Sequence, residues 1–131
     1  MNKESSVVRY SEMPFGTINL RKDGIMFFQP SEGRTTINKR ELQQMLVGLT
    51  KFSNGDPKLF YTHNENYKSL GFEERKFIGD NLHKFCKASA VIENSPVIRF
   101  IGHTINDLFP PKVPMKMFKS EEAAINWLKS L

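Results

Sequence analysis

With 131 residues, the chain has the length of one typical domain and is long enough to bury a sizeable core. Hydrophobic residues make up 39% and charged residues 25%, a globular composition that excludes an intrinsically disordered chain. The net charge of +5 comes from basic residues scattered singly or in pairs, so no specific nucleic-acid site is expected.

The N-terminal part predicts β-structure. Residues 7–11 indicate a short strand, and a turn follows near Pro14 and Gly16. Residues 17–20 alternate polar and apolar side chains, and residues 25–28 are a second β run after the hairpin signal Lys-Asp-Gly. We therefore expect an antiparallel hairpin to open the domain.

A first helix is expected after Asn38, because Glu41 follows it three places later in a capping-box pattern. Apolar side chains then recur at helical spacing up to Phe52. Residues 58–62 predict a short strand, and the polar, aperiodic residues 63–69 predict a long loop.

The alternation continues in the second half. Residues 71–87 predict a helix with Cys86 on its apolar side, and residues 88–92 predict a strand buried on both faces. Ser95 caps a third helix that starts with a proline, and Pro110 ends it.

Residues 113–118 predict a last strand near a sheet edge, because Pro114 cannot donate to a ladder. Ser120 then caps a final helix. The order is ββαβαβαβα, and strands that alternate with helices imply parallel pairing through right-handed crossovers. We therefore predict one α/β domain over residues 1–131, with a mixed, mostly parallel sheet and an N-terminal β-hairpin.

No catalytic residues, metal site or cofactor are expected. The three histidines are dispersed, and His83 with Cys86 provides only two of the three or four ligands that zinc sites use. Cys86 lies in an apolar stripe, where burial raises a thiol pKa and leaves it inert. No Gly-x-Ser-x-Gly elbow or phosphate-binding glycine pattern occurs.

The expected compartment is the cytoplasm. No apolar run approaches the ~20 residues that span a bilayer, and residues 1–6 lack the apolar stretch of a signal peptide. The single cysteine cannot form an internal disulfide, which fits a reducing compartment.

The segment with the strongest functional signal is the polar loop at residues 63–69. It follows a predicted central strand, and α/β sheets bind ligands and partners at loops after the carboxyl ends of their strands. We expect His63, Asn64, Asn66 and Ser69 to form a partner-binding surface. The alternative interpretation of this segment is a solvent-exposed loop without a role.

The C-terminal half carries a recognisable pattern at residues 88–102, 114–118 and 122–128. Its most specific part is Pro-x-Lys-x-Phe at 114–118, followed by a helix that ends in Ala-x-x-Trp-Leu. This pattern resembles a set of small uncharacterised bacterial proteins of the SpoIIAA-like (STAS-like) superfamily. The resemblance implies successive βα units wound as a right-handed superhelix, with helices covering a mixed sheet.

The wider superfamily includes anti-sigma-factor antagonists, which dock onto a kinase-like partner. Phosphorylation of a serine at the start of the helix after the central strand switches them. Here the Asp-Ser-(Ser)-Gly pattern of that family is missing, because Gly71 and Phe72 stand where the Asp and the acceptor Ser would be. Ser69 is the nearest hydroxyl, and it is equally placed to cap the helix.

These observations favour a non-catalytic STAS-like regulatory module that engages a protein partner through the loop after the central strand. The alternative is a small-ligand or lipid carrier, with the eleven Phe and six Met lining an apolar pocket. An enzyme is the least favoured class. The predicted edge strands would also suit a homodimer with a two-fold axis.

Overall fold

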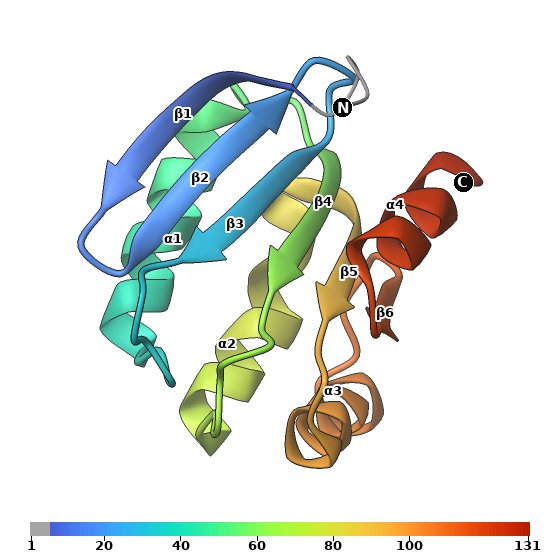
Figure 1. Cartoon of the computed structure of the whole chain (residues 1–131). Coiled ribbons are helices and arrows are strands. Elements are labelled where there is room, and N and C mark those ends of the chain that lie inside the picture. The colour runs from blue at the N-terminus through green and yellow to red at the C-terminus, as the bar shows by residue number, and fades with distance from the viewer. Residues whose placement is uncertain (1–5) are drawn as a thin grey trace.

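A computed structural model of the chain describes residues 6–131 and shows one six-stranded sheet with helices on both faces (Figure 1). Residues 1–5 lie outside this range. They form most of the segment for which the sequence predicts no signal peptide. The strands are β1 (Val7–Met13), β2 (Gly16–Arg21), β3 (Met26–Pro30), β4 (Lys58–His63), β5 (Cys86–Ile92) and β6 (Met115–Phe118). The helices are α1 (Lys39–Phe52), α2 (Phe72–Asn81), the short 3₁₀ helix η2 (Leu82–Lys84), α3 (Pro96–Leu108) and α4 (Glu121–Lys129).

The sheet opens with three strands before the first helix. The predicted order ββα counts two, although a strand is also predicted at residues 7–11. β1 pairs antiparallel with β2, and β2 pairs antiparallel with β3. The first strand is separate because the turn after Met13 reverses the chain, so that residues 7–13 form an outer edge strand. The turn between β2 and β3 lies at the predicted Lys-Asp-Gly, where Gly24 has a φ of 85°.

The remaining pairs, β3 with β4, β4 with β5 and β5 with β6, are parallel. The strands follow one another across the sheet in chain order, and β6 lies at the edge as predicted. The fold class predicted from the sequence, a mixed α/β sheet with an antiparallel start, is therefore confirmed.

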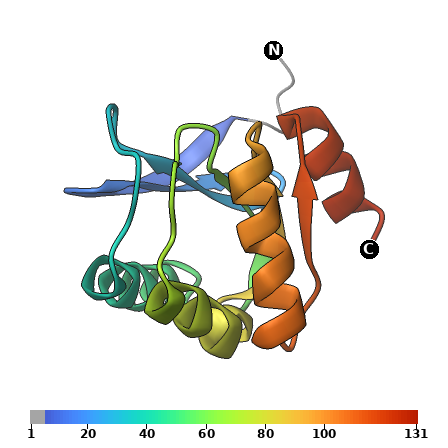
Figure 2. The ribbon, with the colours of Figure 1, turned by 90° about the horizontal axis from the view of Figure 1, so that it is seen from below.

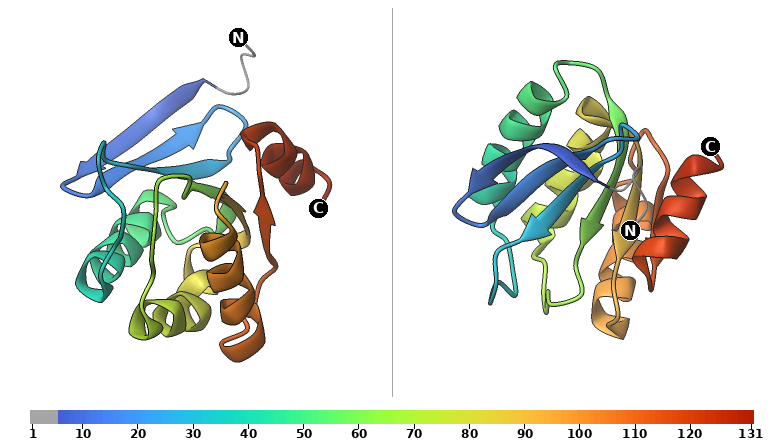
Figure 3. Two further views of the ribbon diagram at one scale, coloured as in Figure 1. Left: turned by 60° about the horizontal axis from the view of Figure 1, so that its bottom comes forward. Right: turned by 45° about the horizontal axis from the view of Figure 1, so that its top comes forward.

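The helices are divided unequally between the two faces of the sheet (Figures 2 and 3). Helices α1, α2 and α3 lie on one face, over a large core that includes Phe28 and Phe60. Helix α4 lies alone on the other face, beside β4, β5 and β6. There Ala124 packs in a smaller cluster with Ala88 and Ala90, whose small side chains permit a close approach of helix and sheet.

The helix starts are those that the capping signals predict. Asn38 accepts the backbone N–H of Glu41 while the Glu41 carboxylate accepts that of Asn38, which completes the capping box of α1. The Ser95 hydroxyl caps α3, and the Ser120 hydroxyl caps α4.

The second helix is shorter than the predicted 71–87. It ends at Asn81, whose side chain donates to the carbonyl of Phe77 and satisfies an acceptor in the last turn. Cys86 is already the first residue of β5, where it lies opposite Lys58 of β4. The prediction that Cys86 lies on the apolar side of this helix is therefore wrong.

Candidate functional site

A polar cleft opens where the parallel strands β3 and β4 end. Its volume is about 260 Å³. The loops after these two strands form its walls, with Gln29, Pro30, Ser31, Glu32, His63, Glu65 and Asn66 lining it. Loops that follow the carboxyl ends of parallel strands are where α/β folds bind ligands and partners. We refer to this part of the molecule as the carboxyl end of the sheet.

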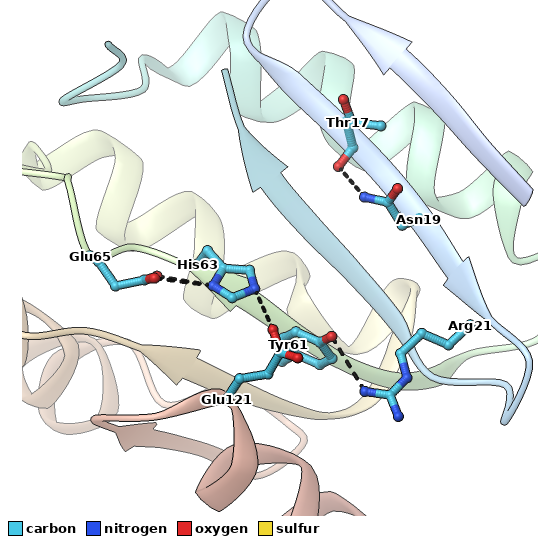
Figure 4. Close-up of polar contacts among 7 residues, drawn as sticks. All are labelled: Thr17, Asn19, Arg21, Tyr61, His63, Glu65 and Glu121. Atoms are coloured by element: carbon cyan, nitrogen blue, oxygen red, sulfur yellow. Dashed lines mark hydrogen bonds and ion pairs between the residues drawn. The ribbon is translucent and has the colours of Figure 1, made fainter. Parts of the chain in front are cut away.

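His63, the last residue of β4, is held between two carboxylates (Figure 4). Its Nδ1 lies 3.1 Å from Oε1 of Glu65, and its Nε2 lies 3.0 Å from Oε2 of Glu121. A neutral imidazole has only one N–H, so only the protonated ring donates in both directions. In that state the side chain forms an ion bridge from the loop after β4 to the first turn of α4.

Two aromatic rings fix the orientation of the His63 ring. Phe27 of β3 stacks on Tyr61 of β4, with ring centroids 4.9 Å apart and planes 7° from parallel. The imidazole ring of His63 packs edge to face against both rings, with centroid distances of 6.1 Å to Phe27 and 5.6 Å to Tyr61. The imidazole is 13% exposed, so it is positioned by packing as well as by its polar contacts.

A buried polar network supports these rings from the other side (Figure 4). Arg21 of β2 donates to the Tyr61 hydroxyl over 3.4 Å and pairs with Asp23 at 2.7 Å. Lys129 of α4 also reaches Asp23, at 3.5 Å. Burial raises the pKa of Tyr61 to about 12, against the opposing effect of its hydrogen bond with Arg21. This network joins β2, β4 and α4, and we assign it a structural role.

Several glutamates lie at the carboxyl end of the sheet, although the chain as a whole is basic. Glu32 and Glu65 line the cleft, and Glu121 stands beside it through its contact with His63. Glu93, which follows β5, is 1% exposed; it accepts the backbone N–H of Ser95 and pairs with Arg99 at 3.0 Å. Of these four, Glu32 is exposed on the cleft wall, where it can attract a positively charged group of a partner.

Apolar side chains are exposed near the same end. Val97 and Phe100 lie on the first turns of α3, which begins just after β5. Their exposed fractions are 54% and 66%. Large exposed apolar side chains beside polar groups are typical of protein-binding surfaces, where they act as anchors.

An apolar cavity of about 100 Å³ lies beneath the loop, between the sheet and helices α1 to α3. Phe28 and Phe60 line it from the sheet, and Ile101 lines it from α3. Asn64 and Tyr67 contribute to its lining from the loop after β4. Burial raises the pKa of Tyr67 to about 12.

The structure brings together two of the four residues predicted to bind a partner. His63 and Asn66 line the polar cleft. Asn64 instead lines the apolar cavity, where its side chain accepts the Thr62 hydroxyl at 3.0 Å. Ser69 is exposed and lines neither space, and its backbone carbonyl accepts the Thr36 hydroxyl.

Sequence reasoning missed Glu121 and Tyr67. Glu121 reaches His63 only because α4 packs beside β4, a tertiary contact without a local signal. Tyr67 had a signal, since a single aromatic residue within a polar loop indicates an anchor into the core. Tyr67 is indeed buried, at 6% exposure.

Metal and thiol chemistry find little support among residues 6–131. In this range no three side chains of His, Cys, Asp or Glu gather as ligands for a metal ion. The Cys86 thiol is 1% exposed and donates to the carbonyl of Leu82. Burial raises its pKa well above the ordinary value, as the sequence predicted, and keeps the thiol in its unreactive form.

The described helices include none with the length and apolar character required to cross a bilayer. The sequence matches none of the curated proteins. The profile of a family described as Domain of unknown function (DUF7793) matches residues 18–131. Among solved structures, the chain is similar to an uncharacterised protein of the DUF3478 family with a SpoIIAA-like fold, from Shewanella loihica PV-4. The TM-score is 0.58 at 15% identity, over 92% of this chain and 90% of that one.

Proposed function

The chain belongs to the DUF7793 family and has a SpoIIAA-like fold, and from this premise we propose that it is a non-catalytic, STAS-like regulatory module of the cytoplasm. It engages a protein partner at the carboxyl end of the sheet. The observation that carries this proposal is the position of His63 between Glu65 and Glu121, at the wall of a polar cleft. This arrangement presents a preformed polar surface on the loop after the central strand.

The partner should combine a basic side chain with an apolar contact. Glu32 is exposed on the cleft wall and can accept a lysine or arginine of the partner. Phe100 is exposed on α3 near the same end and can be covered by an apolar side chain. Charge at a rim directs association, and a buried aromatic anchor provides most of the affinity.

The test begins with capture of the partner from native lysate by the tagged full chain, followed by affinity measurements with the purified partner. We expect Phe100→Ala to weaken binding by at least about tenfold. Leu108→Ala is the matched control, because Leu108 is 61% exposed at the opposite end of the same helix. Equal effects of the two substitutions would place the partner elsewhere.

The polar part of the surface is tested by Asn66→Ala and Glu32→Gln. We expect Glu32→Gln to weaken binding by up to about fivefold at low salt, and less at high salt because ions screen exposed charges. Asn126→Ala and Glu12→Gln are matched controls at exposed positions outside the cleft. If Asn66→Ala and Glu32→Gln leave binding unchanged, the cleft is not part of the interface.

A further inference from the structure

The apolar cavity beneath the loop is larger than the voids that a packed core leaves. Protein interiors contain few voids larger than one water molecule. The cavity measures about 100 Å³. An engineered apolar cavity of roughly 150 Å³ in another protein stays dry and binds benzene. The cavity here has about two thirds of that volume, so a ring the size of benzene fits once flexible lining side chains such as Met45 and Met117 move aside.

One polar group of the lining has no hydrogen-bond partner within residues 6–131. The Tyr67 side chain lines the cavity and its hydroxyl is buried, yet it neither donates nor accepts a hydrogen bond. By contrast, Thr62 and Asn64 bond to each other, and Asn81 donates to the carbonyl of Phe77. Buried polar groups are nearly always paired in folded proteins, so an unpaired one indicates a missing partner.

The Tyr67 hydroxyl lies near an ion pair and not near a free cation. Arg34 and Glu41 are both close enough to act on the Tyr67 hydroxyl, and they form an ion pair with each other. The second carboxylate oxygen of Glu41 accepts the Asn38 backbone N–H in the capping box. The positive charge of Arg34 is thus already paired, so a ligand carboxylate that entered this apolar cavity would lose its hydration without gaining a free cation.

A second donor lies in the same neighbourhood. Nε of Arg34 is buried and, among the described residues, has no hydrogen-bond acceptor. Arg34 is not among the residues that line the cavity, so the Tyr67 hydroxyl is the donor that we assign to an uncharged oxygen atom of the ligand. The rest of such a ligand would be apolar, because aliphatic and aromatic side chains dominate the cavity wall.

We propose that this cavity is a binding site for a small uncharged amphiphile, whose oxygen accepts a hydrogen bond from Tyr67 while its apolar body fills the space between the sheet and helices α1 to α3. The site is distinct from the polar cleft and from the surface proposed for a protein partner. A long acyl chain exceeds the cavity volume, so the cargo is a small molecule.

The experiment titrates the purified full chain with phenol, benzene and benzoate, followed by carbon-13 methyl NMR. Phenol should shift the methyl signals of Ile101 and Met115, which line the cavity, and leave that of exposed Val47 unchanged. The oxygen of phenol can accept a hydrogen bond from Tyr67, and benzene has no such oxygen. Phenol should therefore bind about tenfold more tightly than benzene, and benzoate should not bind.

The variant Tyr67→Phe keeps the ring and removes the hydroxyl. It should weaken phenol binding by about tenfold and leave benzene binding unchanged. Tyr10→Phe is the matched control, since Tyr10 is 63% exposed on β1.

The proposal is overturned if phenol shifts no cavity methyl, if benzoate binds as well as phenol, or if Tyr67→Phe weakens benzene and phenol equally. The comparison of three probes on the unmodified protein stands even if this variant does not fold. No protein partner is needed, so the outcome is independent of the interface test.

Discussion

Tyr61 and Tyr67 show how differently two buried tyrosines are supported. Tyr61 is 1% exposed, stacks on Phe27 and accepts a hydrogen bond from Arg21. Tyr67 is 6% exposed, and its hydroxyl has no partner in the described part of the chain. Both lie in the segment from β4 into its loop, and both have their pKa raised to about 12 by burial.

These raised values predict a loss of stability at alkaline pH. The unfolded tyrosine ionises at about pH 10, so the fold favours the neutral phenol of both residues. Their stabilisation is complete below about pH 10 and is lost as the pH rises towards 12, by up to about 2 to 3 kcal/mol for each residue. Denaturant unfolding at about pH 8 and about pH 11 measures the loss.

The variant Tyr67→Phe should remove its share of this alkaline loss. Tyr10→Phe should change nothing, because Tyr10 is 63% exposed on β1. An alkaline loss of stability that is the same in the parent protein and in Tyr67→Phe would contradict the prediction.

At the scale of the elements, α1 and α2 each contain a glycine with a different packing role. In α1, a Cβ on Gly48 would overlap the terminal methyl of Met13, which is flexible, and would lie 3.3 Å from Cδ1 of Ile18. In α2, a Cβ on Gly79 would overlap the backbone carbonyl of Phe109, directly after α3. Gly79 therefore lets α2 pack closely against the end of α3, whereas Gly48 leaves room for adjustment.

Alanine substitutions at these two positions should have different effects on stability. Both gain about 1 kcal/mol of helix propensity, because glycine is unfavourable within a helix. For Gly48→Ala we expect a free energy of unfolding within about 1 kcal/mol of the parent value. For Gly79→Ala we expect a net loss of about 1 to 3 kcal/mol, because a backbone atom must move. Thermal or denaturant unfolding measures the stability of each variant. Equal stabilities of Gly48→Ala and Gly79→Ala would show that α2 can shift away from Phe109 at no cost.

At the scale of the whole molecule, the two edges of the sheet are protected to different degrees. β6 is four residues long, follows Pro114 and carries Lys116, all of which discourage pairing with another strand. β1 is seven residues long and exposes Val7, Val8 and Tyr10. The charge of Arg9 does not prevent strand pairing at this edge, because the Arg9 guanidinium lies over the Phe52 ring, 4.2 Å from the ring centroid.

This asymmetry makes β1 the edge at which the expected homodimer would form, by antiparallel pairing of two β1 strands around a two-fold axis. Sedimentation equilibrium should show a mass that doubles as the concentration rises. Val8→Lys should shift the equilibrium towards the monomer. Val47→Lys, at a similarly exposed valine on α1, should not. A monomer at every concentration would exclude this assembly.

Most of the fold was predictable because its signals are local. Capping residues such as Asn38 and Ser120 act within one turn, and the alternation of apolar runs with turns defines strands and helices. The end of α2 was not predictable in the same way. Leu82, Phe85 and Cys86 continue the apolar stripe of the predicted helix, but they lie in or beside η2 and β5 because β5 pairs with β4, a non-local contact that overrides helical periodicity.

The sequence by itself determined the α/β class, the helix starts, the burial of Cys86 and the loop after β4 that carries the candidate site. Only the tertiary structure decided how that loop is used. It turned His63 and Asn66 to a polar cleft, Asn64 and Tyr67 to an apolar cavity, and placed Glu121 against His63 from a distant helix. The physical reason is that side-chain direction in an aperiodic loop depends on the elements packed around it, whereas a cap or an amphipathic stripe depends on neighbours within a few residues.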